Sequence, residues 1–116
     1  MLTDERTSEE ISAAIAERLF GKVIEDGYEV VTASDGYRYR MSIKLYASDH
    51  NAALGLVVPK MRRRGYEFWM SDRRGRVQVS FSADGKYSVA LAEFGQEPRA
   101  ICLAAEAALD AERKAE

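Results

Sequence analysis

The 116-residue chain has few of the residues that most often carry chemistry, with one cysteine and one histidine. A single cysteine excludes an internal disulfide and a cysteine-based metal cluster, and we expect Cys102 to be a buried packing residue. His50 follows Ser48-Asp49, a pair that favours a helix N-cap, so we predict a surface or capping role for it. The sequence has no HExxH, calcium-loop, GxGxxG or phosphate-loop motif. We therefore predict a protein that is not an enzyme and needs no cofactor or metal.

Long apolar runs are also absent. No segment approaches the roughly 18–20 apolar residues that a helix needs to cross a bilayer. The first six residues are acidic and polar, unlike a signal peptide. We therefore expect a cytoplasmic protein with no membrane partner. The length suits a single domain over residues 1–116, with residues 1–7 and 111–116 frayed.

Charge is unevenly distributed, although the net charge is only -2. Residues 1–17 carry five acidic residues and one arginine, whereas residues 60–76 carry seven basic residues and two acidic ones. Such a division can steer a charged partner toward one side of the molecule, or it can simply be two solvated faces. Both interpretations stay open.

Hydrophobic periodicity and capping signals predict three helices. Thr7-Ser8-Glu9-Glu10 has the spacing of a capping box, so a helix should run from about 8 to 20 and stop at Gly21. A second helix is expected over about 49–64, with a kink near Gly55 or Leu56 because Pro59 lies inside it. Pro98 suits the first turn of a third helix, whose many alanines allow close approach to a sheet.

Alternation and turn signals predict the strands. We expect a hairpin of Tyr28–Thr32 and Tyr37–Tyr46 around Asp35-Gly36, and then strands at 66–70, 76–82 and 87–93 joined by short turns, one of them at 83–86. The predicted inward residues are Tyr37, Tyr39, Met41, Ile43 and Leu45 in the hairpin, and Val77, Val79, Phe81, Tyr87, Val89 and Leu91 in the later strands. The expected fold is α+β, an antiparallel sheet of four to five strands packed with three helices in the order α-β(β)-α-β-β-β-α.

A basic segment with interleaved aromatic residues is the candidate binding site. The arginines at 62–64 end the second helix, where positive charge also complements the helix dipole. Trp69 lies on the opposite side of its strand from Phe68 and Met70, and an exposed tryptophan among arginines can anchor a protein or stack on a nucleic-acid base. The candidate partner-binding residues are Arg62, Arg63, Arg64, Trp69, Arg73, Arg74 and Arg76.

Residues 49–112 also have the element order of a double-stranded-RNA-binding domain. Such domains hold phosphates with a lysine-rich start of the last helix. This chain has Glu97-Pro98-Arg99 there, so the similarity is one of topology.

Three stretches resemble the phage ABA sandwich domain family of small phage and prophage proteins. The residues at 14–21 resemble the family's IAEKVMGW opening, and Tyr46-Ala47-Ser48-Asp49, Lys60-Met61 and Gly65-Tyr66 match its middle. The segment at 97–105, EPRAICLAA, resembles its PxAICLAAL helix. Lys22 departs from the family, which usually has tryptophan there. The resemblance implies the sandwich fold, an origin in a phage or prophage within a bacterial host, and no catalytic residues.

Several functions are compatible with these features. The first is a non-enzymatic accessory protein that binds a host protein or defence complex, such as a CRISPR effector. The second is a nucleic-acid-binding module that uses the basic 60–76 segment. A small-molecule or enzymatic pocket and a structural role in the phage particle are the others. The Tyr37–Tyr46 strand has an open edge that favours a homodimer slightly, although its cations oppose pairing.

Overall fold

The computed structural model describes residues 5–83 and 86–115, and for Arg73, Lys86 and Ala115 it describes the backbone only. The predicted α+β class is confirmed, but the strands form two three-stranded antiparallel sheets rather than one sheet. The elements in order are α1 (Ser8–Arg18), β1 (Val23–Glu25), β2 (Tyr28–Thr32), β3 (Arg38–Ser42), α2 (His50–Ala52), η1 (Ala53–Val57), α3 (Val58–Arg63), β4 (Glu67–Arg73), β5 (Arg76–Ala83), β6 (Lys86–Glu93) and α4 (Glu97–Ala115). The predicted fraying of residues 1–4 and 116 and the turn at Asp84-Gly85 lie outside the described residues.

The helix α1 begins and ends where its local signals predict. The Thr7 side chain accepts a hydrogen bond from the Glu10 backbone N–H at 3.1 Å, and the Glu10 carboxylate accepts one from the Thr7 N–H at 3.2 Å. This reciprocal capping box satisfies two backbone donors that the first turn leaves without partners. Gly21 follows the helix with φ +66°, a left-handed conformation that glycine adopts without strain.

The second helical region is irregular at the predicted place. The short helix α2 continues into η1, a π-helical turn containing Gly55 and Leu56, and then into α3. Pro59 falls in the first turn of α3. Proline removes one backbone donor and crowds the carbonyl one turn before it, and the wider π turn places that irregularity before the proline. The predicted kink is confirmed.

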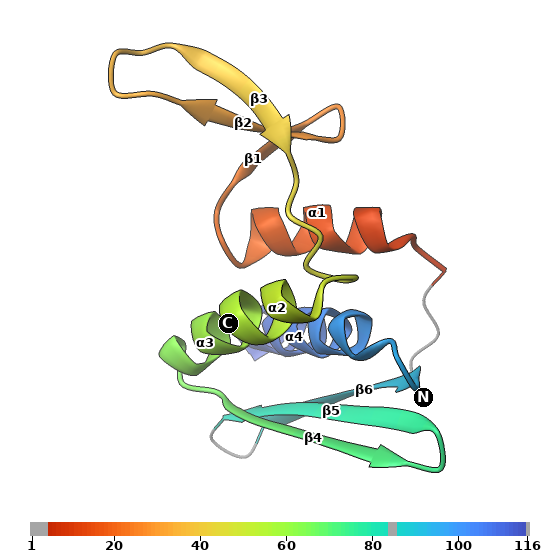
Figure 1. Ribbon diagram of the computed structural model, residues 1–116. Coiled ribbons are helices and arrows are strands. Elements are labelled where there is room, and N and C mark those ends of the chain that lie inside the picture. The colour runs from red at the N-terminus through yellow and green to blue at the C-terminus, as the bar shows by residue number, and fades with distance from the viewer. Residues whose placement is uncertain (1–4, 84–85, 116) are drawn as a thin grey trace.

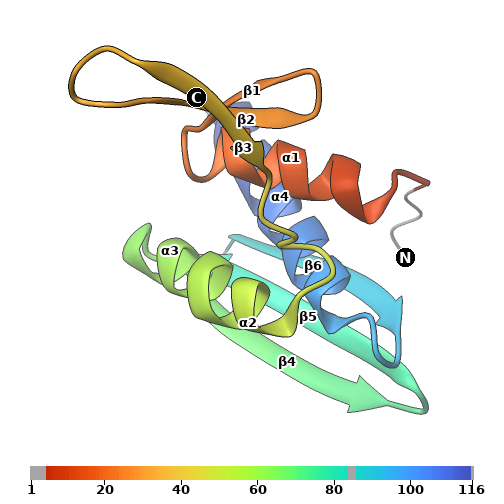
Figure 2. The ribbon, with the colours of Figure 1, turned by 45° about the horizontal axis from the view of Figure 1, so that its top comes forward.

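The helix α4 lies at the centre of the molecule (Figures 1 and 2), between α1 and the sheet of β4, β5 and β6. Its buried face is built mainly from small side chains, with Ile101 and Cys102 also fully buried. These small residues are Ala100, Ala104, Ala105 and Ala108. The helix continues to Ala115, past the point where fraying was expected, and Glu112 in that extension bonds to Arg64 at 2.6 Å.

The side of β6 that faces α4 differs from the prediction. The inward residues Val77, Val79 and Phe81 of β5, which were predicted correctly, pair with Ala92, Ala90 and Ser88. The prediction that Tyr87, Val89 and Leu91 point inward is therefore wrong, and they occupy the opposite face. The physical reason is the close approach of α4, which leaves room only for small side chains; the Ser88 hydroxyl donates a hydrogen bond to the Ala104 carbonyl at 2.7 Å.

The sheet of β1, β2 and β3 stands beyond α1, away from the rest of the molecule (Figures 1 and 2). The strand β1 was not predicted, and β3 ends at Ser42 rather than Tyr46. All five residues of β3 are exposed, so the predicted burial of Tyr39 and Met41 is wrong. Because α1 supports only the base of this sheet, nothing in the described chain covers the apolar side of β3.

The chain also leaves the predicted alternation after Ser42. Tyr46, expected on the wet side, is buried and stacks on Phe20 with ring centroids 5.0 Å apart. Leu45, expected inside, is half exposed, and Tyr37, also expected inside, is about two-thirds exposed just before β3. A turn in which the Tyr46 N–H bonds to the Lys44 carbonyl replaces the strand there, and this turn reverses which side chains point inward.

Candidate functional site

The strongest candidate site is the face of the β4, β5 and β6 sheet that is turned away from α4. We call it the outer face. Among the described elements, no helix lies on this side (Figure 1). Cross-strand pairing places its residues in rows. The rows are Glu67, Ser82 and Tyr87; Trp69, Ser80 and Val89; Ser71, Gln78 and Leu91; and Arg73, Arg76 and Glu93.

The apolar side chains of the outer face are Trp69 on β4 and three residues of β6. Trp69 on β4 is 51% exposed and Tyr87 on β6 is 72% exposed, while Val89 and Leu91 beside them are partly exposed. Polar side chains of β5, including Ser80, lie between Trp69 and the apolar residues of β6. An antiparallel sheet with one face in solvent normally places polar residues on that face. Exposed apolar side chains gathered on one face are typical of an interaction site.

The charged positions of the outer face lie at its two ends. Glu67 lies at one end of β4, and Arg73 lies at the other end. At that second end, Arg76 and Glu93 occupy directly opposite positions on β5 and β6. Among the described side chains of this face, two acidic residues and one arginine give no excess of positive charge.

The structure divides the predicted basic site into two groups. The arginines at 62, 63 and 64 end α3, and Arg74 and Arg76 lie at the hairpin on the far end of β4. The intervening strand of seven residues separates the groups by about 20 Å, at roughly 3.3 Å for each residue. Trp69 lies midway between them. The side chain of Arg73 lies outside what the structure describes.

The predicted arginines also have different surroundings. Arg62 and Arg63 are exposed, whereas Arg64 donates a hydrogen bond to Glu112, which also accepts one from the Tyr66 hydroxyl at 2.6 Å. Arg64 therefore has a structural contact that attaches α3 to α4. Arg74 is exposed at the hairpin turn, with φ +53°.

Sequence reasoning missed Tyr87, Val89 and Leu91 as surface residues. The signal that could have found them is the alternation of small residues, Ser88 and Ala90 among them, in the same strand. A helix rich in alanine packs closely, and it fits a strand face made of equally small side chains. The larger apolar residues of β6 are then left for the other face.

The residues most suited to catalysis or metal binding, Cys102 and His50, make packing or hydrogen-bonding contacts within the fold. Cys102 is fully buried, and this burial raises the pKa of its thiol, as expected for a packing residue. His50 Nε2 lies 3.1 Å from Glu97 Oε2 at the start of α4. A hydrogen bond from its own backbone N–H, and then the contact with His50, lower the pKa of Glu97. The described residues contain no group of three or more histidine, cysteine or acidic side chains placed to hold a metal ion.

A crystal structure of a phage protein from Bacillus cereus ATCC 14579, determined at 2.0 Å, is similar to this chain with a TM-score of 0.70 and 28% sequence identity. The similarity covers 95% of this chain and 94% of that one. No protein-family model matches the chain. No curated protein matches it either. Across the described residues, no helix is both long and apolar enough to pass through a membrane.

Proposed function

We propose that this chain is a phage or prophage protein that acts without catalysis, by binding a protein of the bacterial host through the outer face. The likeness to the Bacillus cereus phage protein supports the phage origin, because it extends over nearly the full length of both chains. The resemblance of its sequence to the phage ABA sandwich domain family supports the same origin.

The observation that carries the binding function is the group of exposed apolar side chains on the outer face. Trp69 and Tyr87 are both more than half exposed, and tryptophan and tyrosine are enriched among the residues that dominate binding energy at protein interfaces. Three strands of about eight residues present a face of about 14 by 25 Å, or roughly 350 Å² in projection. A standard interface takes about 800 Å² from each partner. The outer face therefore supplies the centre of an interface, and the surrounding surface with Arg74 supplies its rim.

The charge of the outer face favours a protein over a nucleic acid. Nucleic-acid binding depends on neutralising phosphates, which needs an excess of basic residues on one surface. Among the described side chains of the outer face, Glu67 and Glu93 outnumber Arg76. At the start of α4, Arg99 donates a hydrogen bond to the Arg6 carbonyl at 2.8 Å, and Glu97 contacts His50. Residues at the position that holds phosphates in double-stranded-RNA-binding domains thus make contacts within the chain.

A host defence complex is the narrower form of this hypothesis. It depends on the resemblance to small phage proteins, some of which block such complexes. Self-association is a second possible partnership, because β3 is an edge strand whose five residues are all exposed.

The test is a pull-down from bacterial lysate, with and without nuclease, that compares matched variants. Trp69→Ser with Leu91→Ser disrupts the outer face, whereas Tyr37→Ser with Met41→Ser removes exposed apolar residues from the other sheet as a control. We expect a protein partner that survives nuclease, is lost with the first pair and is retained with the second. Recovery of nucleic acid alone, released as salt rises, would instead support the nucleic-acid alternative.

A further inference from the structure

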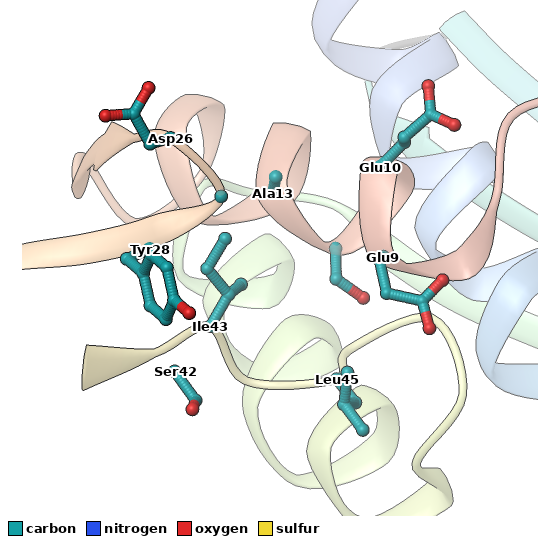
Figure 3. A pocket seen from close by; sticks show the side chains of 10 residues that line it. Glu9, Glu10, Ala13, Asp26, Tyr28, Ser42, Ile43 and Leu45 are labelled. Atoms are coloured by element: carbon teal, nitrogen blue, oxygen red, sulfur yellow. The ribbon is translucent and has the colours of Figure 1, made fainter. Parts of the chain in front are cut away.

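A groove lies between the first half of α1 and the β1–β3 sheet, on the side of the molecule away from the outer face. Figure 3 shows it from close by, with residues from α1, from the turn between β1 and β2, and from the segment that follows β3. Its volume is about 470 Å³, within the range of roughly 300–1,000 Å³ that is common for binding sites.

The floor of the groove is apolar. Ala13 of α1, Ile43 and Leu45 line it, and the ring of Tyr28 stands beside Ile43 (Figure 3). Leu45 and Tyr28 are each nearly half exposed. The strand β3 ends at Ser42, so Ile43 and Leu45 lie in the segment beyond the sheet.

The rim of the groove is acidic. Glu9, Glu10 and Asp26 stand around the opening, and their carboxylates point outward rather than into the floor (Figure 3). No basic side chain lines the groove. Glu10 is occupied in part by the capping box, and Asp26 lies 3.6 Å from Arg40, with both side chains exposed. Glu9 makes no ion pair with any residue that the structure describes.

We infer that this groove binds a protein segment in which apolar side chains are flanked by arginine or lysine. The apolar side chains of the bound segment pack on Ala13, Ile43 and Leu45. Its arginine or lysine side chains lie beside the carboxylates of the rim. A cation near Tyr28 also gains from the electron-rich face of its ring. This arrangement of an apolar floor inside an acidic rim complements an amphipathic basic segment. It is a weaker match to a free amine, which would need carboxylates that converge on the floor.

The test uses the capped tetrapeptide arginine–leucine–leucine–arginine amide and its citrulline counterpart, which has the same shape without the charge. Binding is followed by amide chemical shifts of the ¹⁵N-labelled protein at about 20 mM salt, where surface electrostatics are screened least. We expect saturable shifts at Ala13, Gly27, Tyr28, Ile43 and Leu45, with a Kd on the order of 1 mM for so small a probe. The citrulline peptide should bind about three- to tenfold more weakly, the effect of losing exposed charge pairs.

Separate substitutions test the contributions of the acidic rim and of the apolar floor to peptide binding. Glu9→Gln with Asp26→Asn should remove the preference for arginine over citrulline, and asparagine tolerates the positive φ of +51° at position 26. Glu17→Gln, on the same helix but outside the groove, should leave the preference unchanged. Ala13→Met fills the floor and should abolish the binding of both peptides. Absence of saturable shifts at about 10 mM peptide, equal binding of the two peptides, or shifts that map to the outer face would overturn the inference.

Discussion

Ala90→Leu tests the orientation of β6 directly. Ala90 is fully buried between Val79 and the closely packed α4. A leucine there adds three carbons where the helix leaves no space, and overpacking of this kind costs about 1–3 kcal/mol. The neighbouring substitution Leu91→Ala removes three carbons from a partly exposed side chain on the outer face. It should lower the free energy of unfolding by about 1 kcal/mol or less.

The expected difference is large enough to measure by thermal unfolding. An unfolding entropy of about 2.1 cal/mol/K for each residue gives roughly 0.24 kcal/mol/K for a chain of this length, so 2 kcal/mol lowers the Tm by about 8 °C. The Leu91→Ala variant should stay within about 4 °C of the parent. Circular dichroism at 222 nm, a wavelength that reports the helices, follows both transitions.

The sequence-based orientation makes the opposite prediction. If Leu91 pointed into the core, Leu91→Ala would cost about 2–5 kcal/mol and Ala90→Leu would be nearly neutral. That reversed order of melting temperatures would refute the outer face as described, and with it the proposed binding surface. Urea unfolding of both variants gives the free energy of unfolding without heating, so the comparison does not depend on reversible thermal unfolding.

Three other predictions concern the contacts of α4 and its neighbours. Glu106→Gln weakens the carboxylate contacts with Arg6 at 2.7 Å and Arg18 at 3.2 Å and should cost about 1–3 kcal/mol in urea unfolding; a cost below about 0.5 kcal/mol would contradict a stabilising role. Burial, and then a hydrogen bond to a carboxylate, raise the pKa of Tyr66 to about 12. The unfolded chain releases this proton near pH 10, so the stability that Tyr66 contributes is present below pH 10 and is lost as the pH rises toward 12. Tyr66→Phe should flatten part of that decline when the free energy of unfolding is measured at about pH 9 and about pH 11. Cys102 should resist iodoacetamide at about pH 8 in the native protein and react only after unfolding, since the thiolate is the reactive form; rapid labelling of folded protein would show that the site opens.

Sequence patterns within a few residues correctly predicted where the helices begin and where one of them is interrupted. The capping box at Thr7 and Glu10, the interruption before Pro59 and the small-residue helix after Pro98 all depend on neighbours within a few positions. Sequence alone therefore located the three helical regions to within a few residues. It also placed Trp69 on the opposite side of its strand from Phe68, and Trp69 is half exposed whereas Phe68 is partly buried.

The orientation of β6 could not be read from its alternation alone. Tyr87, Val89 and Leu91 are more apolar than the residues between them, yet α4 accepts only the smaller set. Which set points inward is decided by the element on the other side of the sheet, and that element comes later in the chain. The same limit applies to β3, whose apolar side was predicted to be covered by a layer that the fold does not supply.

The candidate site was predicted only in part. Neighbouring positions in the sequence suggested one basic patch, but an extended strand carries Arg62 and Arg74 to opposite ends of β4. The tryptophan at its centre was identified, whereas the apolar partners on β6 come from a distant segment. Cross-strand pairing, which no local pattern specifies, brings Trp69 and Val89 into the same row.

The central position of α4 has a consequence for the order of assembly. This helix contacts α1, η1 and the β5–β6 hairpin, yet it follows all of them in the chain. A ribosome therefore releases the surfaces that α4 will cover before it releases α4 itself. Contacts between segments such as 11–19 and 100–108 also span nearly the whole sequence, which raises contact order and slows folding. The nascent chain thus carries a sheet whose apolar face, with Val77, Val79 and Phe81, is unshielded until α4 emerges, a stage at which chaperone binding competes with self-association.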